Sequence, residues 1–600
     1  MNIEIFIIIL LVNISLNIHG NAIEWKYCII GAGPSGLQMG YYMEQKQRNY
    51  VIFERGSSAG TFFQNFPRHG TLISINKRFT GESNQEFNMR HDWNSLLTDD
   101  FSTLFRNFSK EFFPNKDDLF KYFNYYGKHW KINIQFNTAI SKIQQDSDKR
   151  FSMEDQNGSH YKCHILVVAT GLSSPHIPNI PGIHYTIGYE SMNMSPEYYE
   201  GKDVLILGKG NSAFEVANSL YGVTNTITLA SNSEVRLAWA THYVGDVRAI
   251  NNNILDTYQL KSLDGILEIE LHSDIIKFEK CNKTGKINIF LRSIDGKTFI
   301  KYDKSYDVVI RCTGWKFNWE IFERNTMPGS VRVNERKKFP AIQADYNSVE
   351  FDNLYFAGAL THSIDFRKSA GGFIHGFRYT SRCLHRIIEY RHHGKKWPHL
   401  VKAINSIVNH FVRRINEGSA TYQMFGNLGD IAIISEDRES YTFVEEYPIL
   451  RLADFELNTG IQVRSKVLVF VFEYGRDFSK VGGNPFSDER IQGTVTGAHL
   501  SNFLHPVIYA YDKLPTEEQI RNRGEKDVLP KPNFLHHVKE DFHTNWRVRE
   551  DSIYPFQRFI ENILKQDLSS YSAETCLNLM LTQTSISINC NINNNIIIAK

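Results

Sequence analysis

Cysteine is scarce and unpatterned in this sequence of 600 residues. Seven cysteines are present, no two are spaced as Cys-x-x-Cys, and none stands in a Cys/His cluster of zinc-ligand spacing. A sparse, odd-numbered set argues against a disulfide framework and against a metal site. Cys28, Cys163 and Cys312 lie in apolar runs, so we expect inert core residues, with redox activity at Cys312 as the alternative.

An excess of charge of one sign is also missing. The chain has 67 Lys and Arg against 65 Asp and Glu, a formal net charge of +2. This balance gives no sign of a nucleic-acid partner, which would need a strong basic excess or a basic stripe. The 42% hydrophobic and 13% aromatic content is that of a folded protein, and 600 residues predict two to four domains.

Long hydrophobic runs are confined to the first residues. Residues 5–11 are apolar without interruption, but a membrane span needs about 20 such residues. We interpret residues 1–20 as a secretory signal peptide, cleaved near Gly20 or Ala22, with a short uncleaved anchor as the alternative. No membrane span is expected after cleavage. Along the secretory route, four Asn-x-Ser/Thr sites could carry glycans: Asn107, Asn157, Asn193 and Asn282.

A strand, a glycine-rich turn, a helix and a second strand open the mature chain. Residues 26–30 predict a buried strand, residues 31–36 read Gly-Ala-Gly-Pro-Ser-Gly, and residues 37–47 are compatible with a helix. Residues 50–53 predict the second strand, which ends on Glu54. In nucleotide-binding folds with this order of elements, the helix N-terminus binds the pyrophosphate and the acidic residue accepts hydrogen bonds from the ribose hydroxyls. The residues expected to bind FAD here are Gly31, Gly33, Pro34, Ser35, Gly36, Glu54 and Arg55.

The same plan recurs 177 positions later, from Gly31 to Gly208. Residues 203–207 predict a strand, residues 208–213 read Gly-Lys-Gly-Asn-Ser-Ala, and a helix and a strand follow. Ser231 stands 23 positions after Gly208, as Glu54 stands 23 after Gly31. A hydroxyl with Arg236 nearby would accept a ribose 2′-phosphate that a carboxylate would repel, so NADPH is expected. The expected NADPH-binding residues are Gly208, Gly210, Asn211, Ser212, Ala213, Ser231 and Arg236.

Two Thr-Gly turns mark where the chain crosses between the two folds. Residues 165–169 and 308–312 are apolar strands that run into Thr170-Gly171 and Thr313-Gly314. Residues 353–358 read as the closing strand of the first fold, and residues 369–373 open a helix. Gly171, Gly358 and Gly372 are expected to approach the flavin closely. We therefore predict an α/β protein with two Rossmann-like domains, the second inserted in the first, and a C-terminal α+β extension.

The domain boundaries follow from these motifs. A FAD-binding domain is expected at residues 22–180 and 340–394, an NADPH-binding domain at residues 181–339, and a low-complexity tail at residues 571–600. Residues 395–570 carry no nucleotide or metal motif, so a binding or lid module is the default interpretation. Within it, residues 467–472 predict a buried strand and residues 554–565 an amphipathic helix.

The glycine motifs and Thr-Gly turns together resemble the flavin-containing monooxygenase and thioredoxin-reductase superfamily. A closer resemblance, over nearly the whole chain, is to a family of endoplasmic reticulum flavoproteins associated with degradation. It implies a luminal location and partners in that process: a J-domain disulfide reductase, lectin and ubiquitin-ligase adaptors, and misfolded glycoproteins. The stretches that carry it are residues 72–78, 91–97, 239–246, 367–379, 422–426 and 501–506.

The sequence departs from these families at two places. The monooxygenase fingerprint before the second glycine motif is absent, because its positions hold Ile183, Tyr185, Tyr189 and Asn193. This argues against oxygenation of small substrates. The chain ends Ile-Ile-Ala-Lys in place of a Lys-Asp-Glu-Leu-like retention signal, so retention is expected to need a partner, and secretion is the alternative.

NADPH would pass hydride to the flavin, but the sequence does not name the acceptor of the flavin's electrons. Three functions of the protein therefore stay open. The first is a reductase that passes electrons to a disulfide on another protein, which is favoured. The second is a monooxygenase or oxidase, and the third is a degradation adaptor with structural FAD. Asn76 and Lys77 are catalytic candidates, because the related monooxygenases place a flavin-contacting Asn and a Lys at these positions; ordinary loop capping is the alternative.

Overall fold

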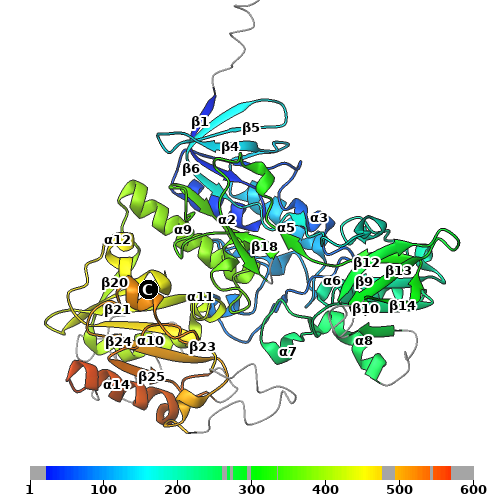
Figure 1. Cartoon of the computed structure of the whole chain (residues 1–600). Helices are drawn as coiled ribbons and strands as arrows, with labels where there is room; N and C mark the ends of the chain where they lie inside the picture. Colours follow the sequence, from blue (N-terminus) through cyan, green and yellow to red (C-terminus); the bar gives the residue numbers. More distant parts are fainter. Residues whose placement is uncertain are drawn as a thin grey trace, which may run out of the picture.

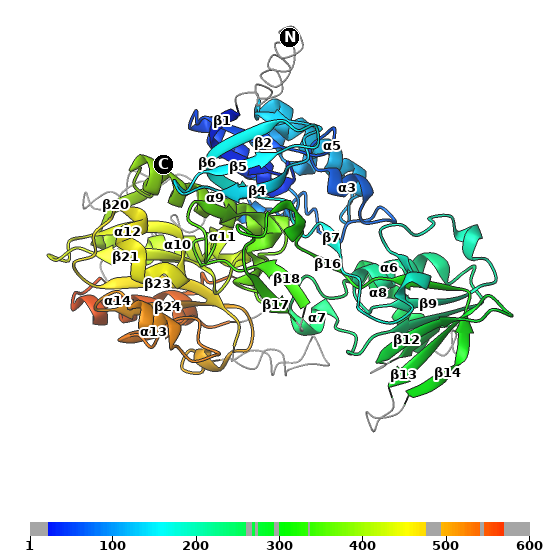
Figure 2. The same ribbon diagram turned by 45° about the horizontal axis from the view of Figure 1, so that its top comes forward.

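The three largest sheets of the described residues have seven, five and six strands, and each organises one part of the chain (Figures 1 and 2). The structure, a computed structural model, describes residues 22–259, 267–270, 274–292, 299–333, 336–475, 494–540 and 545–568. The expected signal peptide, the expected tail, Cys576 and Cys590 lie outside these residues. Among the described helices, none has the length and apolar character to cross a membrane.

The first sheet has a parallel centre with helices on one face. Alternate side chains of β1 (Ile23–Ile30) and β6 (His160–Val168) pack against α2 (Pro34–Gln45), α5 (Lys116–His129) and α9 (Ile374–His393). The predicted strands and the helix after residue 373 are confirmed. The order is β3 (Ile134–Gln135), β2 (Tyr50–Phe53), β1, β6, β5 (Phe151–Glu154), β4 (Ser141–Gln145), with β19 (Leu354–Phe356) pairing β6.

One expectation about this sheet is wrong. Cys28 of β1 and Cys163 of β6 form a disulfide, with their Cα atoms 5.9 Å apart. Both are buried as expected, but they are not free thiols. The 135 positions between them hide the pair in the sequence, because only strand pairing brings the two cysteines together.

The second sheet is the inserted nucleotide fold. Five parallel strands carry α6 (Asn211–Leu220) and α8 (Ala249–Gln259) on one face. An antiparallel sheet of β12 (Ile275–Lys280), β13 (Ile287–Arg292) and β14 (Phe299–Tyr306) covers the other face. The parallel order is β11 (Leu267–Glu270), β10 (Thr226–Ala230), β9 (Asp203–Leu207), β15 (Val308–Arg311), β8 (Ile187–Gly188).

The third sheet, in the C-terminal extension, is antiparallel throughout. One face packs on α10 (Ile407–Glu417) and α14 (Tyr554–Leu564), and the other shares a hydrophobic core with α9 and the first sheet's helices. The extension is therefore continuous with the FAD-binding fold. The order is β20 (His399–Ala403), β22 (Ser440–Pro448), β21 (Leu428–Ile434), β23 (Val467–Glu473), β24 (His505–Tyr511), β25 (Phe534–His537).

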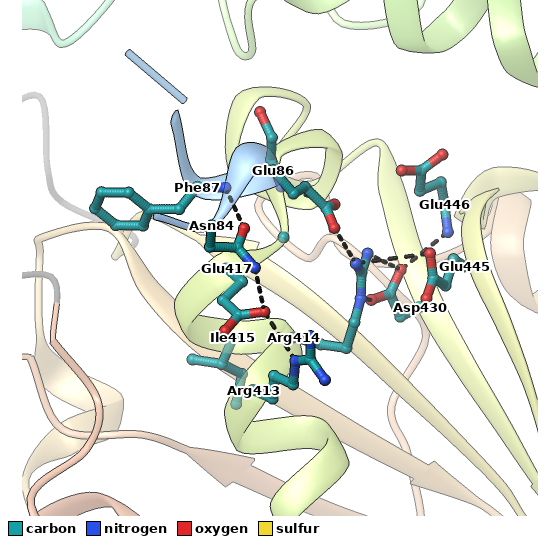
Figure 3. A network of polar contacts seen from close by, with 12 residues as sticks. Asn84, Glu86, Phe87, Arg413, Arg414, Ile415, Glu417, Asp430, Glu445 and Glu446 are labelled. Atoms are coloured by element: carbon teal, nitrogen blue, oxygen red, sulfur yellow. Dashed lines mark hydrogen bonds and ion pairs between the residues drawn. The ribbon is translucent and has the colours of Figure 1, made fainter. Parts of the chain in front are cut away.

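A buried charge network strengthens this junction (Figure 3). Arg414 of α10 is 2.7 Å from Asp430 of β21 and 2.7 Å from Glu86. Glu86 belongs to α4 (Gln85–Met89), in the first nucleotide fold. Glu445 of β22 lies 3.6 Å from the same guanidinium. Arg414 thus ties the extension to the FAD-binding fold.

Candidate flavin and nicotinamide nucleotide site

The first glycine turn forms a cradle at the start of α2. Gly31 has φ +100°, and a Cβ on Gly36 would lie 1.9 Å from the Gly31 carbonyl oxygen, so both positions need glycine for the backbone alone. Gly33 caps α2 without a side-chain hydrogen bond, and the first turn holds no acid. The free N–H groups and the positive end of the helix dipole are therefore available for a pyrophosphate.

Glu54 closes the other side of this cradle. Its carboxylate accepts the Ala32 N–H and the Gly56 N–H, each at 2.8 Å, and its side chain is buried. These bonds fix the carboxylate at the end of β2 while leaving lone pairs for a ribose hydroxyl. Arg55, the next residue, is exposed.

The other predicted FAD contacts gather around the same helix start. Gly358 has φ +74°, and a Cβ there would lie 2.4 Å from the Ser35 hydroxyl. Gly171, at φ +62°, faces open space. Gly372 lies just before α9, against the ring of His362. The cradle, the crossing turn and the start of α9 therefore fit a flavin nucleotide.

The second glycine turn repeats this geometry at the start of α6. Gly208 has φ +121°, and a Cβ would lie 2.4 Å from the Cys312 carbonyl oxygen. Gly210 caps the helix without a side-chain hydrogen bond, Ser212 follows in the acid-free first turn, and Ala213 is buried in the third glycine's place. This turn fits the pyrophosphate of a nicotinamide nucleotide.

The predicted residues around the second cradle have different surroundings. Ser231 follows β10 directly, and Arg236 is exposed in the loop beyond it. Asn211 uses its side chain elsewhere: it donates to the Gly245 and Asp246 carbonyls at 3.1 and 2.8 Å and accepts from the Arg248 N–H at 2.9 Å. Its side chain therefore holds a neighbouring loop.

A stack of side chains lies where the two nucleotide folds meet. The rings of Trp93 and His375 stack at 4.2 Å, and the Arg248 guanidinium of the inserted fold lies 5.0 Å from the Trp93 ring. His375 is buried, and neither ring nitrogen has a hydrogen-bond partner in the described part of the chain. Burial, with Arg378 and Arg248, holds its pKa well below the usual range, so the ring is neutral.

Neither Trp93 nor His375 was predicted as a site residue. Both lie in stretches that carry the family resemblance, residues 91–97 and 367–379, which was the available signal. Their stacking joins segments 282 positions apart, which no local pattern reveals. An unpartnered buried imidazole at the start of α9 is a polar group that a bound flavin could satisfy.

The two catalytic candidates lie near this stack. The Asn76 side-chain amide donates to the Ser109 and Glu111 carbonyls at 3.0 and 3.1 Å, and its Oδ1 has no partner among the described residues. Lys77 is exposed, and its backbone N–H donates to His91. Their catalytic roles stay predictions.

Cys312 is a poor candidate for redox chemistry. It is partly buried beside the second cradle. Desolvation, with Glu215 and Glu190, raises the pKa of its thiol well above the usual range. A protonated thiol is a weak nucleophile, so the structure favours the interpretation of Cys312 as an inert core residue.

Comparison with known proteins agrees with this site. The family model described as pyridine nucleotide-disulphide oxidoreductase matches residues 28–358. FAD-dependent oxidoreductase domain-containing protein 2 of Mus musculus is 45% identical, over 93% of this chain and 86% of the relative. The protein of that name from Danio rerio is 40% identical, over 94% and 87%. Among solved structures, a bacillithiol disulfide reductase from Staphylococcus aureus covers 62% of this chain and 99% of its own, with 16% identity and a TM-score of 0.46.

The matched residues contain both glycine cradles and both Thr-Gly turns. The cofactors are accordingly FAD and a nicotinamide nucleotide, NAD(P)H. Hydride chemistry is supplied by these groups when bound, and the protein binds and orients them. The chain belongs to the pyridine nucleotide-disulphide oxidoreductase family and is an FAD-dependent oxidoreductase.

Proposed function

We propose that this oxidoreductase takes hydride from NADPH and passes electrons to a disulfide on another protein, in the lumen of the endoplasmic reticulum. The observation that carries the NADPH preference is the contrast between the cradles. The first ends on the buried carboxylate of Glu54, and the second ends on Ser231 with exposed Arg236 five residues on. A ribose 2′-phosphate adds negative charge, which the second arrangement tolerates and the first repels.

We assign the acceptor to another protein because the cysteines of the described residues offer no accessible pair. Transfer to an internal disulfide needs two accessible sulfurs beside the flavin. In the described residues, the Cys28–Cys163 disulfide is buried, and the free thiols are Cys281, Cys312 and Cys383. Burial raises the pKa of the Cys383 thiol to about 12, which leaves it inert. An external disulfide is therefore the acceptor that fits the proposal.

A luminal location is supported by the cysteines and the predicted glycan sites. Disulfides persist in oxidising compartments, and the sheet contains one. The four predicted acceptors Asn107, Asn157, Asn193 and Asn282 are all exposed. With the resemblance, these features support a role in degradation of misfolded glycoproteins, with a J-domain disulfide reductase and lectin and ubiquitin-ligase adaptors as partners.

Anaerobic stopped-flow spectroscopy tests the proposal. Under nitrogen, NADPH should bleach the flavin absorbance rapidly, and NADH should do so at least about tenfold more slowly, the selectivity expected from one lost charged contact. A protein disulfide added afterwards should restore the oxidised spectrum and release thiols, which a thiol reagent counts.

Other outcomes point to the other two functions. A flavin that NADPH does not bleach would indicate a structural cofactor in an adaptor. A flavin reoxidised by oxygen with stoichiometric peroxide or product oxygen, and not by disulfides, would indicate an oxidase or monooxygenase. Either result contradicts the proposed acceptor.

A further inference from the structure

Residues 242–248 of the inserted fold, the docking segment, contact two other parts of the molecule, the extension and the FAD-binding fold. The segment follows α7 (Ala238–Thr241). In Figures 1 and 2, α7 lies on the side of the inserted fold that faces the rest of the chain. His242 stacks on Tyr474 of the extension at 5.1 Å. Tyr243 meets His362, and Arg248 meets Trp93, both in the FAD-binding fold.

The central contact is a chain of hydrogen bonds with a defined direction. The Tyr243 hydroxyl lies 3.0 Å from Nε2 of His362, and Nδ1 of His362 lies 2.9 Å from Asp365. A carboxylate only accepts, so Nδ1 carries the proton and Nε2 accepts from the tyrosine. Asp365 also accepts from the Ser369 hydroxyl. His362, Asp365 and Ser369 are buried, which fixes this tautomer in place.

An ion pair and ring contacts also hold Tyr243 and His362 together. Arg367 of the FAD-binding fold pairs with Asp246 of the docking segment, and its guanidinium lies 4.9 Å from the Tyr243 ring centre. The rings of Tyr243 and His362 are nearly parallel, at 7°. Gly245 leaves room for this tyrosine, because a Cβ there would lie 2.6 Å from the ring.

A residue with strained backbone stands on each side of this contact. His242 has φ +58° and Arg367 has φ +60°, the left-handed region that residues other than glycine rarely adopt. Strain of this kind persists where surrounding contacts hold it, and it is common at ligand clamps. Here one strained residue stands on each partner of the same junction.

The docking segment is also joined to the second cradle. Asn211, the first residue of α6, bonds Gly245, Asp246 and Arg248 through its side chain. On the other partner, His362 packs against Gly372 at the start of α9. The Tyr243–His362 contact therefore connects the two nucleotide sites through a few rigid neighbours.

We propose that Tyr243, held by His362 and Asp365, is a positioning residue that docks the inserted fold for hydride transfer. This inference rests on the proposed function. Hydride transfer needs the two cofactors in a fixed mutual placement, and errors near 1 Å cost up to about a hundredfold in rate. The extension takes part because Tyr474 and Phe503, at 5.1 and 5.7 Å, pack on His242.

The test compares Tyr243→Phe with a matched control, Tyr221→Phe. Tyr221 is exposed, in the same fold and outside the junction. In FAD-loaded protein without NADPH, Tyr243→Phe should speed hydrogen exchange in residues 238–248 and 362–369. At saturating NADPH, it should slow flavin bleaching by about tenfold, as for one lost hydrogen bond, and leave NADPH affinity within about twofold. The control should match the wild type in both measurements.

A second pair of variants separates the hydrogen bond from packing. His362→Gln keeps an acceptor for the phenol, and His362→Leu does not, so only the leucine variant should reproduce the tyrosine phenotype in full. Unchanged exchange in Tyr243→Phe would overturn the docking contact. Raised exchange with an unchanged bleaching rate would overturn the positioning role. Failure of NADPH to bleach the wild type would instead refute the proposed function, while exchange still decides the docking contact.

Discussion

Gly33 and Gly210 differ from the other motif glycines in what requires them. Their φ values of −74° and −96° suit any residue, and a Cβ on either would meet no heavy atom within 4 Å. By contrast, a Cβ on Gly36 or Gly208 would clash with a backbone carbonyl oxygen. Backbone and packing therefore do not demand glycine at the first pair, and a bound pyrophosphate does.

We expect the residues after β10 to determine the preference for NADPH over NADH. Replacing Arg236 with glutamate should lower kcat/KM for NADPH by at least about tenfold, because a carboxylate repels the 2′-phosphate. The value for NADH should change by less than about threefold. Steady-state kinetics with both coenzymes checks this, with Arg236→Lys as the control that keeps the charge. Equal losses of kcat/KM for both coenzymes would show that Arg236 does not contact the 2′-phosphate.

The residues that join the two folds were the hardest to foresee. Tyr243 and His362 are 119 positions apart, and Trp93 and His375 are 282 apart. Each lies in a loop, a short 3-10 helix or the first turn of a helix, where no periodic pattern predicts what it contacts. The glycine turns were predictable because their strand, turn and helix are contiguous in sequence.

Elements with a strong periodic or apolar signal were predicted well. The strands around both glycine turns, the strand at residues 467–472 and the helix at residues 554–565 all appear, as β1, β2, β9, β10, β23 and α14. The edge strands β20 and β25 have exposed, mixed side chains and gave no signal. The shared core of the extension was also missed, because α9 contributes to it with residues assigned to the FAD-binding fold.

The disulfide between β1 and β6 should contribute measurably to stability. Replacing Cys28 and Cys163 with alanine should lower the free energy of unfolding by about 2–4 kcal/mol, since the bond closes a long loop. Urea denaturation measures the change, and peptide mass spectrometry without reductant should find the two cysteines linked. Cys281→Ser, at a partly exposed free thiol, should leave stability within about 0.5 kcal/mol. Unlinked peptides would contradict the assignment.

At the scale of the whole molecule, Arg414 couples the extension to the FAD-binding fold. Arg414→Met should cost about 3–5 kcal/mol, because it leaves the fully buried Asp430 without its partner. Arg413→Met is the control, since Arg413 is partly exposed and pairs only with its helical neighbour Glu417 among the described residues; about 0.5 kcal/mol is expected. Thermal and urea unfolding measure both. Similar losses for the two variants would contradict the coupling.

The same network predicts a pH effect on stability. Burial, with Asp430 and Glu86 nearby, raises the pKa of Glu445 to about 7. A raised carboxyl pKa stabilises the fold below the unfolded value and loses that effect as pH rises through 7. Glu445→Gln should therefore gain stability relative to the wild type at pH 8 compared with pH 5, by urea denaturation. The exposed Glu439→Gln should show no such difference, and a matching response would contradict the prediction.

The central claim is that two glycine cradles hold FAD and NADPH separately. The most direct measurement is the absorbance spectrum of the wild type, Gly33→Ala and Gly210→Ala before and after anaerobic NADPH. All three should fold, because a Cβ at either glycine enters open space. Gly33→Ala should lose the flavin spectrum, whereas Gly210→Ala should keep it and resist bleaching by NADPH. A Gly33→Ala protein that retains its flavin, or a Gly210→Ala protein that NADPH bleaches as fast as the wild type, would contradict the account.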